Sequence, residues 1–349
     1  MVAGGQRDPE SLRPGLERWF RSHHEPGPAT VASIARPTTG LSCETLFVEL
    51  AYDGARTSGR ETVVVRLPPA GAGLFPEYDF AAQARVQQRL ASTEVPVAAP
   101  ALHEPDTSWI GCDFLVMPRV PGRVVTTFPS FLASGWLAAA PVGYQRAVQR
   151  GFFDVLASLH RIDHASLGLD HLARGSSPFL AAELSWWSDY LAWATDGSPL
   201  PELAAGLTWC RDRVPLPEPP PSLLWGDVQL ANAVFTDDGS TGAIVDWEMA
   251  SIGPAELDLG WYFALHDMTV AANGGTDLPG FTGRDVVLAG YSERLGRPVT
   301  DLAWYETFAL VRSGAIMQRV ARLLGARGVD DSWLTRGNPT IERLRHLPV

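Results

Sequence analysis

The sequence predicts an α+β protein with two unlike lobes, a small β-rich N-terminal lobe with one helix and a larger, mainly helical C-terminal lobe. Strand-like segments gather before residue 120, and long helical patterns dominate after it. The length of 349 residues also suits two domains or lobes. We therefore expect an N-terminal helical extension at 1–29, an N-lobe at 30–118, a hinge at 119–123 and a C-lobe at 124–349.

The N-terminal part begins with a short helix over residues 9–24 and continues as strands. The middle strands alternate around a link that contains glycine and serine, as a hairpin does. A second helix is predicted at 79–91, because its apolar residues recur at near-helical spacing and Asp79 can cap its first turn. The expected strands lie at 30–38, 44–54, 60–69 and 112–120.

Helical patterns dominate the C-terminal part, and a short β-rich island interrupts them at residues 222–248. This order, strands first and helices later, is typical of α+β proteins rather than of parallel α/β folds. The expected long helices lie at 145–162, 181–195 and 302–325.

All 28 basic residues are arginine, and the sequence contains no lysine. A lysine Schiff base, a catalytic lysine amine and any phosphate-binding motif that requires lysine are therefore excluded. The 39 acidic residues give a formal net charge of −11, which argues against binding of nucleic acid. With 46% hydrophobic residues, the chain is expected to bury a large core.

The three cysteines, Cys43, Cys112 and Cys210, are far apart and form no CxxC pair. Neither a disulfide framework nor a zinc cluster follows, and a reducing compartment fits this pattern. The first residues lack the apolar core of a signal peptide, and no run of residues is apolar enough for a membrane span. We therefore expect a cytoplasmic protein that has no membrane partner.

The most informative segment is 222–253, in which polar residues stand at the ends of apolar strands. Asn232 follows Asp227 by five residues, and Asp246 ends the next apolar strand, fourteen residues further on. A turn at 237–239 is expected to return the second strand beside the first and to bring Asp246 near Asn232. Phosphoryl transfer needs a carboxylate beside the attacking hydroxyl and oxygen ligands for Mg²⁺, and these residues can supply both.

The segment resembles the catalytic loop and metal-binding strand of the aminoglycoside phosphotransferase family, which includes choline and homoserine kinases. The family pattern H-G-D-x4-N followed by D-[FWL]-[DE] is found here as WGDVQLAN and IVDWE, with Trp225 in place of histidine. The resemblance extends over residues 35–325 and implies a protein-kinase-like fold and an ATP- or GTP-dependent phosphotransferase. It further implies that Asp227 is the catalytic base, that Asn232 and Asp246 hold Mg²⁺, and that Asp258 in ELDLGWY braces the catalytic loop.

The same resemblance assigns nucleotide-binding residues in the N-lobe. Segment 37–48 lies where the family has its phosphate-covering turn, with Thr39, Gly40 and Ser42 as the candidate contacts. Arg66 stands where kinases carry the phosphate-binding lysine, and guanidinium can bind phosphate in a forked geometry. Gln83 replaces the usual glutamate, so a hydrogen bond to Arg66 is expected in place of an ion pair.

Residues 115–122, LVMPRVPG, resemble the kinase hinge that binds adenine. Met117 takes the gatekeeper position. Pro118 lacks an N–H group but keeps its carbonyl, which can accept from the adenine amino group. Val120 keeps the N–H that adenine N1 requires.

Other interpretations compete with a small-molecule kinase. A nucleotide-binding pseudokinase or ligand sensor is suggested by Gln83, by Trp225 and by a phosphate-covering turn in which Gly40 is the only glycine. The presence of Asp227, Asn232 and Asp246 favours the enzyme. A protein kinase is disfavoured because no activation segment follows Asp246. His160 and His164 have the spacing of metal ligands, but a structural role is favoured because no third ligand is evident. The hydroxyl acceptor stays open among sugars, amino alcohols, macrolides and lipid-like alcohols, and the oligomeric state stays open as well.

Overall fold

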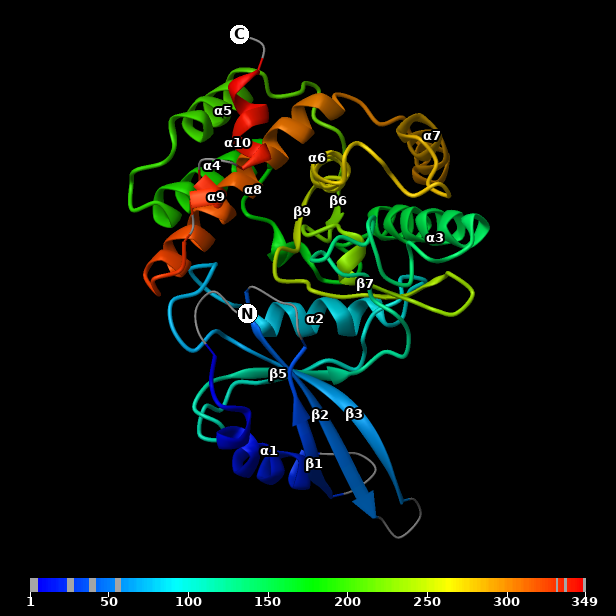
Figure 1. The fold of residues 1–349 in the computed structure, drawn as a ribbon, viewed down its shortest axis with the longest axis vertical. Coiled ribbons are helices and arrows are strands. Elements are labelled where there is room, and N and C mark those ends of the chain that lie inside the picture. The colour runs from blue at the N-terminus through cyan, green and yellow to red at the C-terminus, as the bar shows by residue number, and fades with distance from the viewer. Residues whose placement is uncertain are drawn as a thin grey trace. The chain divides into compact units, whose positions relative to one another are not determined.

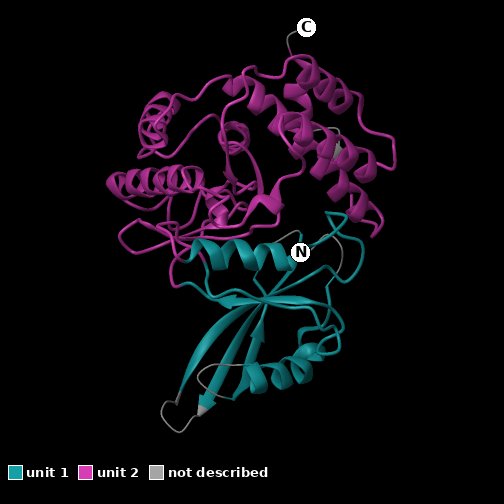
Figure 2. Ribbon diagram, turned by 180° about the vertical axis from the view of Figure 1, so that it is seen from behind, with its two compact units in different colours: residues 1–91, 98–120 teal, residues 92–97, 121–349 magenta. Residues whose placement is uncertain are grey.

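The structure is a computed structural model that describes residues 6–23, 28–37, 42–53, 58–330, 332–335 and 338–347. The chain divides into two compact units (Figure 2). The first unit comprises residues 1–91 and 98–120, and the second comprises 92–97 and 121–349. Residues 92–97, placed in the N-lobe by the sequence analysis, group with the second unit. The domain boundaries given above stay a prediction.

The first unit is built on one antiparallel sheet with the strand order β1-β2-β3-β5-β4 (Figure 1). The strands expected in this unit are confirmed, and the long β2–β3 hairpin runs in register from Glu44 opposite Leu67 to Asp53 opposite Ser58. Strand β4 was not expected, because three residues give too short a pattern to read. The bounds are β1 Ala29–Ala35, β2 Glu44–Asp53, β3 Ser58–Leu67, β4 Leu102–Glu104 and β5 Phe114–Pro118.

Helices α1 (Pro9–His23) and α2 (Phe80–Leu90) cover opposite faces of this sheet (Figure 1). Leu16 and Trp19 of α1 share a core cluster with Val65 of β3. Because neighbouring residues of a strand point to opposite faces, Arg66 is directed to the other side, where it contacts Gln83 of α2. Both expected helices are confirmed, and Asp79 caps α2 by accepting from the N–H of Ala82 at 2.8 Å.

Glu44 anchors the beginning of the chain to the sheet. Its carboxylate is fully buried and forms ion pairs with Arg7 at 2.6 Å and with Arg36 at 3.0 Å. Arg7 also donates its backbone N–H to Glu44 at 2.9 Å. The segment that the sequence analysis describes as an extension is therefore joined to the core of the first unit by α1 and by this ion-pair cluster.

The second unit is mainly helical, and α8 lies at its centre. Sixteen of the residues of α8 are buried, and α8 packs along α6. Gly260 permits this close approach, because a Cβ atom there would lie 2.5 Å from the backbone carbon of Tyr305. The bounds are α3 Val142–His160, α4 Phe179–Ala194, α5 Pro201–Asp212, α6 Glu256–Ala272, α7 Arg284–Leu295, α8 Leu302–Gly325, α9 Ser332–Thr335 and α10 Pro339–Arg345.

The expected helices α3, α4 and α8 are confirmed, whereas α5, α6, α7, α9 and α10 were not predicted. Every residue of the first half of α6 is buried, from Glu256 to Ala264, so it has no polar face to reveal a helical period. Within the described residues, no helix is long and apolar enough to cross a lipid bilayer.

Two short antiparallel ribbons complete the second unit. Strands β7 (Ala233–Phe235) and β8 (Thr241–Ile244) form the hairpin that the sequence predicts. Strand β6 (Pro221–Leu224) instead pairs with β9 (Ser251–Pro254), which was not predicted. Residues 92–97 join this unit because Ile244 donates its N–H to the carbonyl of Pro96 at 2.9 Å.

Candidate active site

Asp227 lies in the loop between β6 and the short helix η2 (Leu230–Asn232), at the end of a buried strand. Three neutral donors hold its carboxylate. Trp261 donates its indole N–H to Oδ1 at 2.9 Å, while Asn232 and Gln229 donate their amide groups to Oδ2 at 2.7 and 2.8 Å. The orientation of the carboxylate is therefore fixed from several sides without a neutralising cation in the set.

The surroundings of Asp227 favour the binding of a proton by its carboxylate. Burial and, next, the negative charge of Asp246 raise the pKa of Asp227 above its ordinary value, although the hydrogen bonds from Gln229, Asn232 and Trp261 act in the opposite direction. A carboxylate with a raised pKa binds a proton more readily than an exposed one. This property suits a group that accepts a proton from an attacking hydroxyl.

The hairpin brings Asn232 and Asp246 to neighbouring positions, as the sequence analysis predicts. The N–H of Val245, the residue before Asp246, donates to the backbone carbonyl of Asn232 at 2.9 Å. The amide nitrogen of Asn232 is directed to Asp227, so its amide oxygen is not the atom that contacts this carboxylate. Asp246 has a φ of +67°, which is uncommon for a residue other than glycine and is found where the surroundings enforce it.

This donor set fits a hard divalent cation. One carboxylate oxygen donor and one amide oxygen donor are the ligand types that Mg²⁺ prefers, since it keeps several waters and takes few protein ligands. The negative charge of Asp246 raises the pKa of Asp227, because the two carboxylates repel each other. A cation bound at Asp246 would relieve this repulsion.

Asp258 braces the catalytic loop, which confirms the expectation drawn from the family resemblance. Its two carboxylate oxygens accept from the backbone N–H groups of Trp225 at 2.8 Å and Gly226 at 2.9 Å. His160 contacts the same carboxylate at 2.9 Å, and both side chains are fully buried. The other ring nitrogen of His160 contacts the hydroxyl of Tyr291, so both nitrogens are engaged.

These contacts give His160 a structural role, as the sequence analysis favours. His164 instead pairs with Asp170 at 2.8 Å near the surface. The described residues contain no group of three or more histidine, cysteine, aspartate or glutamate side chains arranged to hold a metal ion. Asn232 and Asp246 are a different donor pair, since one of the two side chains is an amide.

Trp225 and Gly226 shape the loop before Asp227. The indole N–H of Trp225 donates to the carbonyl of Val245 at 2.8 Å, and its ring packs 6.3 Å from that of Trp247. Trp225 therefore ties the two strand ends together where the family has histidine. Gly226 has a φ of +88°, and a Cβ atom there would lie 2.2 Å from the carbonyl oxygen of Met249, so only glycine fits.

In the first unit, Arg66 and Gln83 form the contact that the sequence predicts. The Arg66 guanidinium donates to the Gln83 amide oxygen at 3.4 Å, and both side chains are buried. Ser42, predicted to contact phosphate, is buried and donates its hydroxyl to the Tyr78 hydroxyl at 3.3 Å. The predicted contacts Thr39 and Gly40 lie outside the described residues.

The predicted adenine-binding residues stand at the end of β5. Pro118 is the last residue of β5 and pairs with Val63 of β3. The N–H of Arg119 is taken by the carbonyl of Thr62 at 3.2 Å. The next N–H along the chain belongs to Val120, the residue that the sequence analysis assigns as the donor to adenine.

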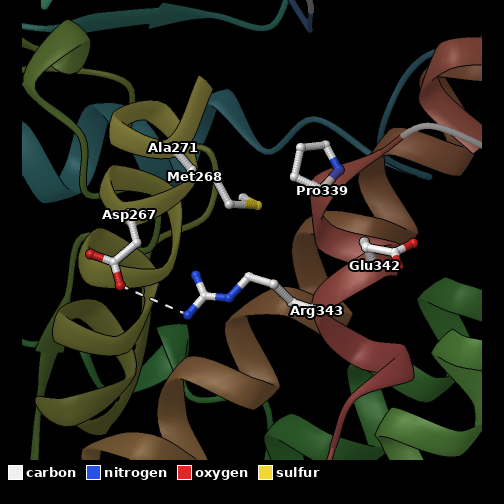
Figure 3. Close-up of a pocket in the computed structure, with 6 residues that line it drawn as sticks. All are labelled: Asp267, Met268, Ala271, Pro339, Glu342 and Arg343. Atoms are coloured by element: carbon white, nitrogen blue, oxygen red, sulfur yellow. Dashed lines mark ion pairs between the residues drawn. The ribbon is translucent and has the colours of Figure 1, made fainter. Parts of the chain in front are cut away.

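A cavity of about 520 Å³ lies between α6 and α10 of the second unit (Figure 3). Met268 stands two turns after Trp261 on α6, so the two side chains project from the same face of that helix. At the rim, Asp267 pairs with Arg284 at 2.8 Å and with Arg343 at 3.8 Å. The cavity is lined by Asp267, Met268, Ala271, Pro339, Glu342 and Arg343.

Sequence reasoning missed two of the three donors to Asp227, namely Gln229 and Trp261. A signal for Trp261 was available, because it follows Asp258 by three residues. Residues three apart lie on the same side of a helix, so a helix that directs Asp258 to the loop also directs Trp261 there.

Known proteins are similar to most of this chain. The sequence model of the family described as "Phosphotransferase enzyme family" matches residues 52–292. The chain is also 27% identical, over 332 residues, to acyl-CoA dehydrogenase family member 11 of Mus musculus. That match covers 90% of this chain but 40% of the relative, so this chain spans less than half of the longer protein.

Among solved structures, the fold is similar to a "putative aminoglycoside phosphotransferase" from Ralstonia eutropha, with a TM-score of 0.69 and 23% identity over 95% of this chain and 96% of the other. It is also similar to the macrolide 2′-phosphotransferase MphH from Brachybacterium faecium, with a TM-score of 0.55 and 19% identity over 92% and 97% of the two chains. These likenesses confirm the α+β, kinase-like fold that the sequence analysis expects.

Proposed function

This chain belongs to the phosphotransferase enzyme family, and from that premise we propose that it transfers the γ-phosphate of ATP or GTP to a hydroxyl group of a small molecule. The observation that carries the proposal is the arrangement around Asp227. Its carboxylate accepts from three neutral donors, has a raised pKa and follows a loop braced by Asp258. Such an arrangement supports a base that is held in one orientation before the substrate arrives.

In the proposed reaction, the acceptor hydroxyl donates its hydrogen bond to Asp227. The hydroxyl oxygen attacks the γ-phosphorus while its proton passes to the Asp227 carboxylate. The bond between the γ-phosphorus and the bridging oxygen breaks, and the nucleoside diphosphate leaves with that oxygen and the electron pair. Because the protein forms no covalent bond in this step, positioning and charge stabilisation provide the catalysis.

We propose that Asn232 and Asp246 hold Mg²⁺, because their oxygen donors fit this ion and their strands are joined by the hydrogen bond from Val245. When bound, Mg²⁺ supplies positive charge that neutralises the phosphate oxygens. We further propose that Arg66, positioned by Gln83, contacts the nucleotide phosphates.

The other nucleotide contacts of the sequence analysis stay proposals. Thr39, Gly40 and Ser42 would donate to the phosphates, and Ser42 would have to exchange its contact with Tyr78 for one with the nucleotide. The Pro118 carbonyl and the Val120 N–H would bind adenine.

The cavity between α6 and α10 is the proposed place for the body of the acceptor. Met268 lies seven residues after Trp261, about 10 Å along the helix at the usual rise per residue. An acceptor seated against Met268, Ala271 and Pro339 would have to extend along α6 to present its hydroxyl to Asp227. Such an acceptor is extended and partly apolar.

A panel of candidate acceptors can be chosen from this shape and from the names of similar proteins. Solved structures of similar fold are named for aminoglycosides and macrolides, so both compounds are included. The longer relatives are named as members of an acyl-CoA dehydrogenase family, so an acyl thioester that carries a hydroxyl group is included as well. Hydroxyacyl thioesters, which have an extended and apolar acyl chain, complete the panel.

The test is Mg²⁺-dependent consumption of ATP and GTP with each member of the panel. Asp227→Asn should abolish turnover while calorimetry still detects binding of nucleotide. The exposed turn residue Asp237 supplies the matched control, and Asp237→Asn should behave as the parent. Turnover that survives Asp227→Asn would remove Asp227 from its proposed role.

A second function, binding of nucleotide without turnover, is favoured by the neutral Gln83 partner of Arg66. It predicts that nucleotide raises the melting temperature of the protein while no member of the panel supports consumption. The complete hydrogen-bond set around Asp227 favours the enzyme, because a binding protein does not need an oriented base.

A further inference from the structure

Arg312 places a buried positive charge directly behind the catalytic loop. It lies on α8, its residue is 3% exposed, and aromatic rings pack against its guanidinium. The guanidinium carbon lies 4.9 Å from the ring centre of Trp187 and 4.7 Å from that of Trp261. Among the described residues, no carboxylate oxygen lies within 4.0 Å of the Arg312 guanidinium, so Arg312 forms no ion pair; the nearby Glu183 pairs with Arg174 instead. The Nε of Arg312 has no hydrogen-bond partner among these residues.

A buried arginine without an ion pair is expensive, so its retention needs an explanation. Burial lowers the pKa of Arg312 to about 10, which still leaves it charged at neutral pH. The nearby charges that act on it are those of Glu183, Arg174, Asp258 and Asp227. The stacking on two indole rings compensates part of the lost hydration, since a cation over an indole face is attracted by the ring.

Two contacts connect this guanidinium to the proposed base. Arg312 donates to the backbone carbonyl of Gly226, the residue immediately before Asp227, at 3.3 Å. The Trp261 ring beneath it donates its indole N–H to Asp227 Oδ1 at 2.9 Å. Arg312 therefore contacts both the peptide that leads into Asp227 and the side chain that orients its carboxylate.

We propose that Arg312 is a positioning residue for phosphoryl transfer, which fixes the Gly226 peptide and the Trp261 indole and through them the Asp227 carboxylate. This inference rests on the proposed function of Asp227. Arg312 touches neither the substrate nor the reacting atoms, so its loss should lower turnover without weakening the binding of nucleotide. A base displaced by about 1 Å can lose on the order of 100-fold in rate.

The chain offers a matched control on the same helix. Arg319 of α8 stacks on Trp193 of α4 at 4.2 Å from the ring centre, and it is partly buried. Arg319→Met removes the same type of arginine–tryptophan contact at a site that does not carry the catalytic loop. Comparison with Arg312→Met therefore separates the proposed positioning from the general packing of α8.

The experiment measures kcat and KM for ATP with the best acceptor of the panel. We expect Arg312→Met to lower kcat by about 10- to 100-fold while KM for ATP changes less than about 3-fold. Arg312→Lys, which keeps the charge, should recover part of the loss, and Arg319→Met should match the parent. Trp261→Phe removes the indole N–H together with the five-membered ring, keeps an aromatic ring at this position, and should reproduce the loss even if Arg312→Met does not fold.

A kcat of Arg312→Met or Trp261→Phe within about 2-fold of the parent would overturn the proposal, as would an equal loss in Arg319→Met. Crystal structures of the two methionine variants supply a readout that does not depend on activity. The proposal expects the Asp227 carboxylate to lose its contact with Trp261 in Arg312→Met alone, and an unchanged loop would contradict it. A parent that consumes no nucleotide contradicts the proposed function, while these structures still decide the role of Arg312.

Discussion

The two regions proposed for the reaction differ in the length of the hydrogen bonds that hold their side chains. In the second unit, the Asp227 carboxylate accepts three hydrogen bonds of 2.7 to 2.9 Å, and Asp258 secures the preceding peptides. In the first unit, Arg66 donates to Gln83 over a longer distance of 3.4 Å. The difference follows the tasks assigned to the two regions.

A base must be oriented before the reaction, because any reorganisation during proton transfer raises the barrier. A cation that binds phosphate gains from remaining adaptable, since its strong interactions form only when nucleotide is present. We therefore expect substitutions around Asp227 to affect turnover or folding strongly, and substitutions around Arg66 to act mainly on the binding of nucleotide.

The largest effect is expected for Asp258→Ala, which removes the acceptor of two backbone N–H groups and of His160. These donors would remain buried and unpaired, so the free energy of unfolding should fall by about 3–5 kcal/mol. Urea denaturation measures this loss. The exposed pair of His164 with Asp170 is the control, and Asp170→Ala should cost less than about 1 kcal/mol.

The next effect is expected for Asp246→Asn, which keeps the size of the proposed Mg²⁺ ligand but removes its charge. Turnover should fall by about 100-fold and should require more Mg²⁺ for half-maximal rate, because a carboxylate binds this ion more strongly than an amide does. A titration of Mg²⁺ at saturating ATP measures both quantities. An unchanged Mg²⁺ requirement would exclude Asp246 as a ligand.

A smaller effect is expected for Arg66→Ala, which removes the proposed phosphate contact. KM for ATP should rise by about 10- to 100-fold, the range of a hydrogen bond to a charged group, while kcat changes less. Arg66→Lys should retain part of the affinity. Arg60 of the same strand pairs with Glu49 at the surface, and Arg60→Ala should leave KM at the parent value.

The smallest effect is expected for Gln83→Glu, which creates the ion pair that the family usually has. Because both side chains are buried, the attraction between the charges is largely offset by their lost hydration. We expect KM for ATP to change by less than about 3-fold. A much larger gain in affinity for ATP would show that the neutral glutamine limits the binding of phosphate by Arg66. It would also weaken the contrast between the two regions.

The sequence was sufficient for those elements whose pattern is local. The β2–β3 hairpin alternates, α2 has a cap at Asp79, and D-x4-N sets Asn232 close enough to donate to Asp227. Helix α6 was missed because its first half is buried on every side, and β9 because its four residues include glycine and proline. The pairing with β6, rather than any local preference, makes β9 a strand.

The residues that contact or support Asp227 were harder to predict than the position of Asp227. Trp261 and Arg312 reach the loop only because α6 and α8 pack along each other, and a contact between helices so far apart in the chain leaves no spacing to read. Arg312 does stand out in one respect, as a charged residue within the apolar run of α8. A charged side chain in such a run indicates a buried polar contact.

The ion-pair cluster of Glu44 has a practical consequence for anyone who shortens or labels this protein. Removing the first seven residues would take away the guanidinium and the backbone N–H that Arg7 supplies, while the carboxylate would stay buried beside Arg36 alone. Proteolytic trimming ahead of α1 should therefore lower the melting temperature of the whole first unit.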